Sequence, residues 1–318
     1  MISKETLENI ECKVCKNNSH PDFELAFKKD HLEIVRCKKC SFVFIPHFFR
    51  KQIKYTDYKD ENVLKQIRLG NDWLKFQRHH LRFKLIKKYK PSGNLFDLGV
   101  GWGHFLYTGK LLGYNTAGIE ISKMPYTYAV EDLKLNVKHI DFFDLEENPG
   151  HYDIITMWDV LEHIDDCDLV IQKCSRMLAD GGIIVIQVPQ IDSYFAKKYK
   201  EKWKMMGLDH VNYFSKKTIT NLLEQNSFKV KKIKSSLEIK LFIMYVLFPK
   251  IQKLKGKKKA KKVNSATRQE YFNKTVNRPK WMLKIMVFFH NILYELLSFF
   301  GIGEEMIVVA EKQAIEKK

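Results

Sequence analysis

The chain has 318 residues, 45% of them hydrophobic, and it carries a formal net charge of +18. This length suits one large domain with an attachment, or two domains, and the apolar content permits a full core, so disorder is not the default expectation. The basic excess favours polyanionic partners such as nucleic acid, anionic lipid or phosphorylated substrates, although solvated lysines would give the same total. Residues 2–11 are polar and charged rather than signal-like, so we expect a cytoplasmic protein whose six cysteines bind metal or pack as buried thiols.

Two Cys-x2-Cys pairs lie near the beginning of the chain. The four cysteines are Cys12, Cys15, Cys37 and Cys40. The pairs stand about twenty residues apart, which is the spacing of a zinc ribbon. Two such turns complete a tetrahedral four-sulfur site, and four protein ligands leave no open position, so we expect a structural zinc ion. Unligated thiols are the alternative. Short strands are predicted at Phe23–Phe27, Leu32–Arg36 and Phe42–Phe44.

A basic helical pattern runs from Tyr58 to Tyr89, and the segment Pro91–Gly93 ends it. The next stretch, Asn94–Leu106, combines a short apolar strand, a glycine-rich turn and the start of a helix, which is the first unit of an open α/β sheet. Asp97 ends the strand. Three glycines follow at alternate positions: Gly99, Gly101 and Gly103.

The glycine pattern separates two classes of cofactor. The dinucleotide fingerprint would require glycine at the position of His104, and the nicotinamide enzymes are therefore disfavoured. Glu120 closes the following apolar run at the separation used to grip ribose hydroxyls, so a nucleoside ligand is favoured over a bare turn.

The alternation of strands and helices continues beyond this unit. Further strands are predicted at Thr116–Ile121, Val137–Ile140, Tyr152–Met157, Ile183–Val188, Phe228–Ser235 and Glu305–Lys312. Helices are predicted between them, which implies a mainly parallel sheet with helices on both faces.

Several of these stretches resemble class I S-adenosylmethionine (SAM) dependent methyltransferases. The D-x-G-x-G-x-G pattern of Asp97–Gly103 resembles motif I of that family. Tyr152–Ile155 with Asp159–His163, and Leu178–Gly182, are similar to its later stretches. His210–Ser215 resembles the branch often found beside polysaccharide genes, whose members often carry such a cysteine ribbon. The resemblance implies a Rossmann-like seven-stranded sheet in which Glu305–Lys312 is the antiparallel last strand.

The same resemblance implies the positions of the cofactor. Gly99, Gly101 and Gly103 would lie against the methionyl part of SAM, and Asp97 would both support the turn and face the ligand. The remaining contacts would come from Glu120 to ribose, from Asp141 and Phe142 to adenine, and from Asp159 to the methionyl end.

Two histidines are candidates for the base that serves the methyl acceptor. His163 and His210 both follow predicted strands, and imidazole titrates near neutrality. For His163 the alternative is a packing role at the strand–helix junction. Asp209 and Tyr213 are neighbours that could assist.

The segment 236–300 interrupts the sheet pattern before the last strand. It contains the apolar run Leu241–Phe248, lysines between Lys250 and Lys262, and the apolar helical stretch Trp281–Phe300. Either the apolar stretches pair as a buried hairpin, or the last one lies with the lysines on an anionic membrane surface. We therefore predict a zinc ribbon over 1–55, a SAM-binding core over 56–235, this insertion over 236–300, and the final strand and tail over 301–318.

The leading functional hypothesis is methyl transfer from SAM to a small-molecule or sugar acceptor, directed at oxygen, in surface glycan or lipid-linked glycan synthesis. An RNA methyltransferase that uses the ribbon and the basic surface is the second hypothesis. A non-catalytic SAM-fold binding protein is the third. The sequence leaves the acceptor, the methylated atom and the oligomeric state open.

Overall fold

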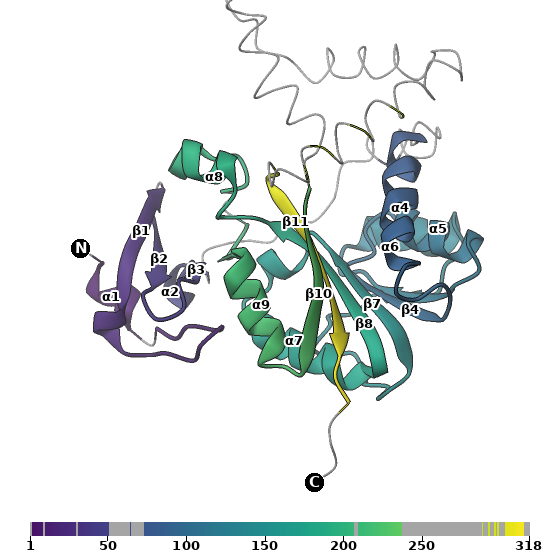
Figure 1. The fold of residues 1–318 in the computed structure, drawn as a ribbon, viewed down its shortest axis with the longest axis horizontal. Coiled ribbons are helices and arrows are strands. Elements are labelled where there is room, and N and C mark those ends of the chain that lie inside the picture. Colours follow the sequence, from purple (N-terminus) through teal and green to yellow (C-terminus); the bar gives the residue numbers. More distant parts are fainter. Residues whose placement is uncertain are drawn as a thin grey trace, which may run out of the picture.

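The computed structural model describes residues 2–8, 10–29, 31–50, 64, 73–206, 209–236, 288, 292, 296, 298 and 303–314. Its centre is a seven-stranded sheet with helices on both faces, and a four-stranded sheet lies beside it (Figure 1).

The seven-stranded sheet has the order β10-β11-β8-β7-β4-β5-β6. Its strands are β4 (Asn94–Leu98), β5 (Asn115–Ile119), β6 (Val137–Lys138), β7 (Tyr152–Trp158), β8 (Leu178–Pro189), β10 (Phe228–Ser236) and β11 (Glu305–Lys312). The five neighbouring strands β8, β7, β4, β5 and β6 pair in parallel. Strand β11 runs antiparallel to both of its neighbours, β8 and β10. This arrangement confirms the predicted fold class, including the antiparallel last strand.

The register of β10 and β11 brings two residues that are far apart in the sequence opposite each other. Ser236, the last residue of β10, pairs with Glu305, the first residue of β11. Most of the predicted insertion between them lies outside the described residues, and its two proposed arrangements lie there too. Among the residues that the structure does describe, no helix has the length and apolar character that crossing a bilayer requires.

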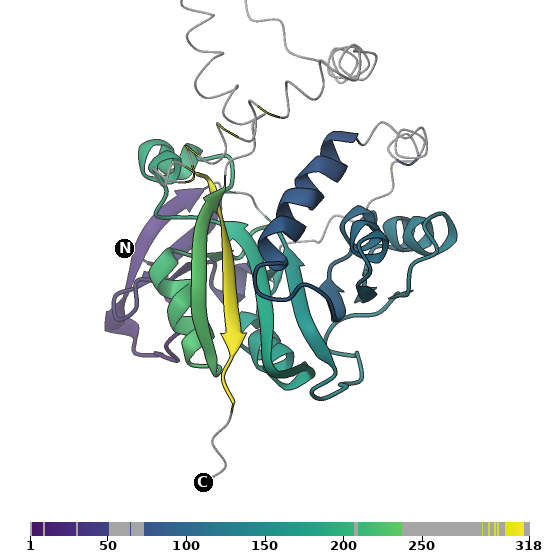
Figure 2. The same ribbon diagram turned by 45° about the vertical axis from the view of Figure 1, so that its right-hand side comes forward.

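Helices cover both faces of the large sheet (Figures 1 and 2). One face carries α4 (Trp73–Ile86), α5 (His104–Leu111) and α6 (Lys123–Glu131), and the other carries α7 (Cys167–Met177) and α9 (Lys216–Glu224). Successive strand residues point to opposite faces. Accordingly Leu95 and Ile154 pack in the core under α4 and α5, while their neighbours Phe96 and Ile155 pack under α7 and α9.

The remaining short elements connect this frame. They are α1 (Lys4–Leu7), a 3-10 turn at His20–Asp22, α2 (His47–Arg50), a 3-10 turn at Leu161–His163, α8 (Tyr194–Tyr199) and a 3-10 turn at Lys200–Lys202. The predicted strand bounds agree with the structure to within a few residues, except that β8 begins at Leu178 rather than Ile183. Its first part joins β7 through an irregular register, and Gly181 there has a φ of +70°.

The four-stranded sheet belongs only partly to the N-terminal cysteine unit, by which we mean the described residues up to 50. Its order is β1 (Phe23–Lys29), β2 (Leu32–Cys37), β3 (Val43–Phe44) and β9 (Asn212–Tyr213). The first three strands confirm the predicted hairpin and third strand. The fourth, β9, comes from the segment that follows β8, and it pairs with β3 through Val43↔Tyr213 and Phe44↔Asn212.

The cysteine unit therefore shares its core with the large sheet. The ring of Phe42 lies 5.2 Å from that of Phe214, and both belong to the apolar cluster that fills the space under α7 and α9. A unit this small buries too little apolar surface alone, so it packs against the core and pairs its third strand.

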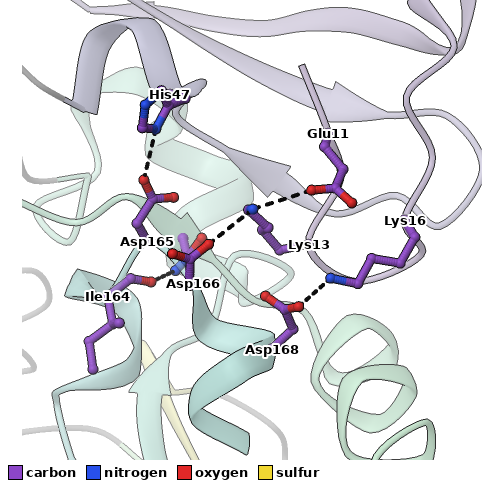
Figure 3. A network of polar contacts seen from close by, with 9 residues as sticks. Glu11, Lys13, Lys16, His47, Ile164, Asp165, Asp166 and Asp168 are labelled. Carbon is purple, nitrogen blue, oxygen red and sulfur yellow. Dashed lines mark hydrogen bonds and ion pairs between the residues drawn. The ribbon is translucent and has the colours of Figure 1, made fainter. Parts of the chain in front are cut away.

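Polar contacts fix the same junction at the beginning of α7 (Figure 3). Lys13 lies 3.0 Å from the carboxylate of Asp166, and His47 lies 3.2 Å from that of Asp165. Lys16 pairs with Asp168, whose side chain is buried. Basic groups of the cysteine unit thus meet acidic groups at a helix N-terminus, where negative charge is favourable.

Candidate functional site

The glycine turn after β4 follows a left-handed path. Gly99, Gly101 and Gly103 have φ values of +79°, +55° and +78°. Their surroundings differ, however. A Cβ atom at Gly99 would lie 2.6 Å from Val160, and one at Gly103 would lie 2.9 Å from Leu135, whereas one at Gly101 would meet no atom within 4 Å. The first and third glycines therefore allow close packing, and of the three only Gly101 has open space beside it.

Glu120, just after β5, closes over this turn. One carboxylate oxygen accepts a hydrogen bond of 2.6 Å from the N–H of Gly101, and the other accepts one of 2.7 Å from the N–H of Ser122. The side chain is only 5% exposed. Each oxygen keeps a further lone pair, so the carboxylate can accept hydroxyl donors from a ligand lying beside Gly101.

Asp97 lies beneath the turn rather than on its surface. Its side chain is buried, and it accepts a hydrogen bond from the hydroxyl of Thr156 on β7. Burial raises the pKa of the Asp97 carboxyl to about 8, against the lowering effect of the Thr156 hydrogen bond and of Arg82. The sequence missed a related constraint at Gly118, where a Cβ atom would lie 2.6 Å from the carbonyl oxygen of Asp97.

Asp159 follows β7 and has a φ of +60°, which is strained for a residue other than glycine. Two contacts hold its carboxylate. Gln187 on β8 donates to both oxygens, at 2.9 and 3.1 Å, and Arg78 on α4 lies 3.3 Å away. The strained backbone and its supports fix this side chain at the carboxyl ends of the parallel strands, where open α/β sheets bind their ligands.

Sequence reasoning missed the residues that support Asp159. Gln187 also donates to Glu305 at 2.9 Å and accepts from Arg82 at 3.0 Å, and the Arg82 guanidinium lies 3.9 Å from the centre of the Trp158 ring. The available signal was a glutamine inside the apolar run of β8, because a buried polar side chain needs partners.

Of the two residues predicted to contact adenine, Asp141 is exposed to solvent and Phe142 is buried in the core. The Asp141 carboxylate is exposed and accepts a hydrogen bond of 2.8 Å from the N–H of Phe143. The ring of Phe142 is buried in the core, with the ammonium of Lys173 5.1 Å from its centre. The neighbouring Phe143 ring is 45% exposed, so it is the aromatic face that a flat ligand can reach.

The two candidate histidines lie together. The ring centres of His163 and His210 are 4.7 Å apart, although the residues come from different segments. Nδ1 of His163 lies 2.9 Å from the carbonyl oxygen of Asp209, and Nδ1 of His210 lies 2.7 Å from that of Met205. A carbonyl oxygen only accepts, so Nδ1 carries the proton in each neutral ring and Nε2 carries the lone pair.

Burial lowers the pKa of His210, and the neighbouring His163 lowers it further. The imidazole therefore stays neutral and able to accept a proton at neutral pH. Tyr213, named as a helper, is buried in β9 and its pKa is raised by burial. Asp209 contributes its carbonyl to His163, and its carboxylate lies 3.8 Å from the same ring nitrogen.

The four cysteines of the N-terminal pairs converge. Sγ of Cys12 lies 3.5 Å from that of Cys40, and Sγ of Cys15 lies 3.6 Å from that of Cys37. All four sulfur atoms lie within 4.8 Å of one another, and none is in a disulfide. Four thiolates bound tetrahedrally at about 2.3 Å would be about 3.8 Å apart, so this donor set fits a zinc ion.

Comparison with known proteins gives a consistent picture. Residues 74–233, which are half of the chain, match the family model of a methyltransferase domain. An uncharacterized protein of Methanocaldococcus jannaschii is 28% identical over 145 residues, covering 45% of this chain and 68% of the relative. The ubiquinone biosynthesis O-methyltransferase of Pelagibacter ubique is 28% identical over 164 residues, covering 48% of this chain and 68% of the relative.

Among solved structures, a SAM-dependent methyltransferase of Thermotoga maritima is 16% identical, with a TM-score of 0.47, and covers 78% of this chain and 97% of that one. The family match spans β4 to β10 and includes the glycine turn, Glu120 and Asp159. The chain therefore belongs to this methyltransferase domain family and is a SAM-dependent methyltransferase.

Proposed function

We propose that the protein transfers the methyl group of SAM to a hydroxyl oxygen of a small-molecule or sugar acceptor in surface glycan or lipid-linked glycan synthesis. The observation that carries this proposal is the pair of imidazoles His163 and His210, which lie together, are each held by a backbone carbonyl, and include one ring, His210, whose pKa is lowered by burial. A hydroxyl must lose a proton during methyl transfer, and a neutral imidazole accepts one.

SAM supplies an activated methyl group on a sulfonium centre. In our proposal its methionyl part lies over Gly101, and Glu120 accepts hydrogen bonds from its ribose hydroxyls. Asp159, held in place by Gln187, faces the methionyl end. Asp97 acts from beneath the turn, where its buried carboxyl accepts a hydrogen bond from Thr156 and supports the backbone of the cofactor loop. Gly99 and Gly103 act indirectly, because they allow the turn to pack against Val160 and Leu135.

For the adenine, we retain Asp141 as the polar contact and assign the aromatic contact to Phe143. The buried ring of Phe142 leaves only its backbone for a ligand. The chain's other contribution is orientation, because in-line displacement needs the acceptor oxygen held opposite the sulfur.

Oxygen as the methylated atom is supported by the relatives named O-methyltransferases. The sugar class is supported only by the resemblance of His210–Ser215 to the branch beside polysaccharide genes. No described residue favours RNA, and the high net charge alone keeps that alternative open. A non-catalytic binding protein remains the third alternative.

The test is a product search with isotopically labelled SAM on three pools: sugar nucleotides, lipid-linked saccharides and short RNA. Mass spectrometry should place one new methyl ether on a hydroxyl of a saccharide or other small molecule. Methylated RNA, with binding that weakens steeply as salt rises, would support the second hypothesis instead. Tight SAM binding without turnover on any pool would support the third.

We further propose that Cys12, Cys15, Cys37 and Cys40 hold one structural zinc ion. Their sulfur separations and the absence of disulfides support it. The domain limits predicted from the sequence remain a proposal, with the cysteine unit docked on the core rather than independent of it.

Peripheral contact with an anionic membrane is proposed from the sequence alone, because the lysines of 250–262 lie outside the described residues. Liposome flotation tests this proposal. Binding should need anionic lipid and should vanish when Lys257–Lys259 become glutamate. Equal recovery of the protein in the soluble fraction with and without anionic vesicles would exclude membrane contact.

A further inference from the structure

Glu162 is a buried carboxylate that the proposed chemistry leaves unused. Its side chain is fully buried, and neither of its oxygens has a hydrogen-bond partner within the described part of the chain. An ionised carboxylate in this position is costly unless it is paired or coordinates a metal. Asp159, Asp209 and Glu305 are near enough to add to the negative charge around it.

The neighbours of Glu162 are the two histidines already described. One nitrogen of His163, one nitrogen of His210 and one oxygen of Glu162 lie within 4.8 Å of one another. Ligand atoms held at about 2.1 Å from one cation are about 3 to 4 Å apart, so these atoms need to approach one another by at most about 1 to 2 Å to coordinate it.

The hydrogen bonds of the rings favour the same conclusion. Both Nδ1 atoms are engaged by backbone carbonyls, of Asp209 and Met205, which leaves Nε2 as the ligand atom of each ring. Metal-binding histidines usually donate their second N–H to a carbonyl or carboxylate in this way, and that partner fixes the tautomer and the ring. Both rings are partly exposed while Glu162 is buried, so the open side of the site faces away from the carboxylate.

We propose that Glu162, His163 and His210 bind a divalent transition-metal cation, which holds the acceptor hydroxyl beside the methyl donor. Two imidazoles and one carboxylate suit Mn²⁺, Fe²⁺, Co²⁺ or Zn²⁺ better than Mg²⁺ or Ca²⁺, which prefer all-oxygen ligands. Three protein ligands leave positions open for the acceptor. This inference deepens the proposed function and rests on it for the identity of the acceptor only.

The role of the cation follows from its charge. A hydroxyl that contacts it has a lowered pKa and loses its proton to solvent. The oxygen then forms a bond to the methyl carbon as the carbon–sulfur bond breaks, and the electron pair of that bond stays on sulfur. With the cation bound, the histidines position the acceptor through it, and this role replaces the role of proton acceptor that we proposed for them above.

Mn²⁺ binding to the full-length protein tests the inference, with zinc already bound to the cysteine unit. Electron paramagnetic resonance titration in the presence of SAM and without any acceptor should give one Mn²⁺ site per chain. Glu162→Gln and His210→Ala should weaken this site more than about 100-fold, which exceeds the 10–100-fold loss caused by removing an outer partner.

Asp209→Asn is the matched control, because it neutralises a neighbouring carboxylate but keeps the carbonyl that His163 contacts. It should bind Mn²⁺ within a few-fold of the wild type. Absence of a stoichiometric site in the wild type, or equal binding by Glu162→Gln, would overturn the metal site. Neither result would bear on O-methylation itself, which the product search tests separately.

Discussion

The N–H of Gly101 and the carboxylate of Glu120 are joined by a hydrogen bond of 2.6 Å, which ties the glycine turn to the end of the neighbouring strand. The acidic residue and the turn are therefore one preorganised unit. A cofactor that occupies the open side of Gly101 meets a carboxylate already aimed at it.

The first prediction concerns this turn. Gly101→Val should lower SAM affinity by more than about 100-fold, because its side chain would enter the space left open there. Gly113→Val is the matched control, since Gly113 also has a positive φ and open surroundings but lies after α5. Both variants carry left-handed strain of about 1–2 kcal/mol. If calorimetry showed equal SAM affinity in the two variants, the cofactor would not bind beside Gly101.

The second prediction concerns the buried Asp97. Its pKa of about 8 in the folded protein exceeds its value of about 3.9 in the unfolded chain, so the folded state binds the extra proton. This contribution to stability is complete below about pH 4 and is lost as the pH rises towards 8 and above. The loss is at most about 1.4 kcal/mol per pH unit.

Asp97→Asn resembles the protonated form and keeps an oxygen that can accept from Thr156. Its free energy of unfolding, measured in urea at pH 5 and at pH 8, should fall less over this interval than that of the wild type. Identical pH dependence in the two proteins would show that Asp97 ionises normally.

The third prediction concerns the histidine pair. His163→Ala and His210→Ala should each lower kcat by about 10²–10⁴-fold on the identified acceptor, with SAM affinity preserved, because these rings serve the acceptor. His151→Ala is the control, since that exposed histidine stands just before β7, at the opposite end of the strand. Normal turnover in both site variants would leave orientation alone as the source of catalysis.

The fourth prediction concerns the cysteine unit. Cys37→Ser should contain one zinc ion fewer per chain than the wild type by elemental analysis. The variant should keep SAM binding but lose turnover, because β9 pairs with β3 and His210 lies two residues before β9. Cys174→Ala, which removes a buried thiol in α7, should keep the zinc. A Cys37→Ser variant that lacks zinc but still turns over would show that the acceptor site near His210 does not depend on the cysteine cluster.

The local parts of this structure could be predicted from the sequence. Neighbouring residues in the chain determine three of its features: the strand ending at Asp97, the positive-φ glycines and the position of Glu120. Such short-range patterns can be recognised directly in the sequence. The cysteine cluster was predictable too, because its spacing reflects two short turns.

The rest depends on contacts between distant segments. Nothing in the sequence around Asn212 indicates that it pairs with a strand of the cysteine unit, and nothing near His210 indicates that His163 lies beside it. The separate roles of the three glycines were also hidden, because Val160 and Leu135 determine them from other elements. The burial of the Phe142 ring was hidden for a similar reason, since the sequence does not show which of two adjacent rings faces the core.

The pairing of Ser236 with Glu305 has a consequence for how this enzyme could diversify. A segment whose two ends meet at opposite positions of a hairpin can be exchanged as a cassette, because a short turn would join the same strands in the same register. The pairing of β10 with β11 therefore does not fix the length of the chain that joins them, and that length can change in evolution without a change of register.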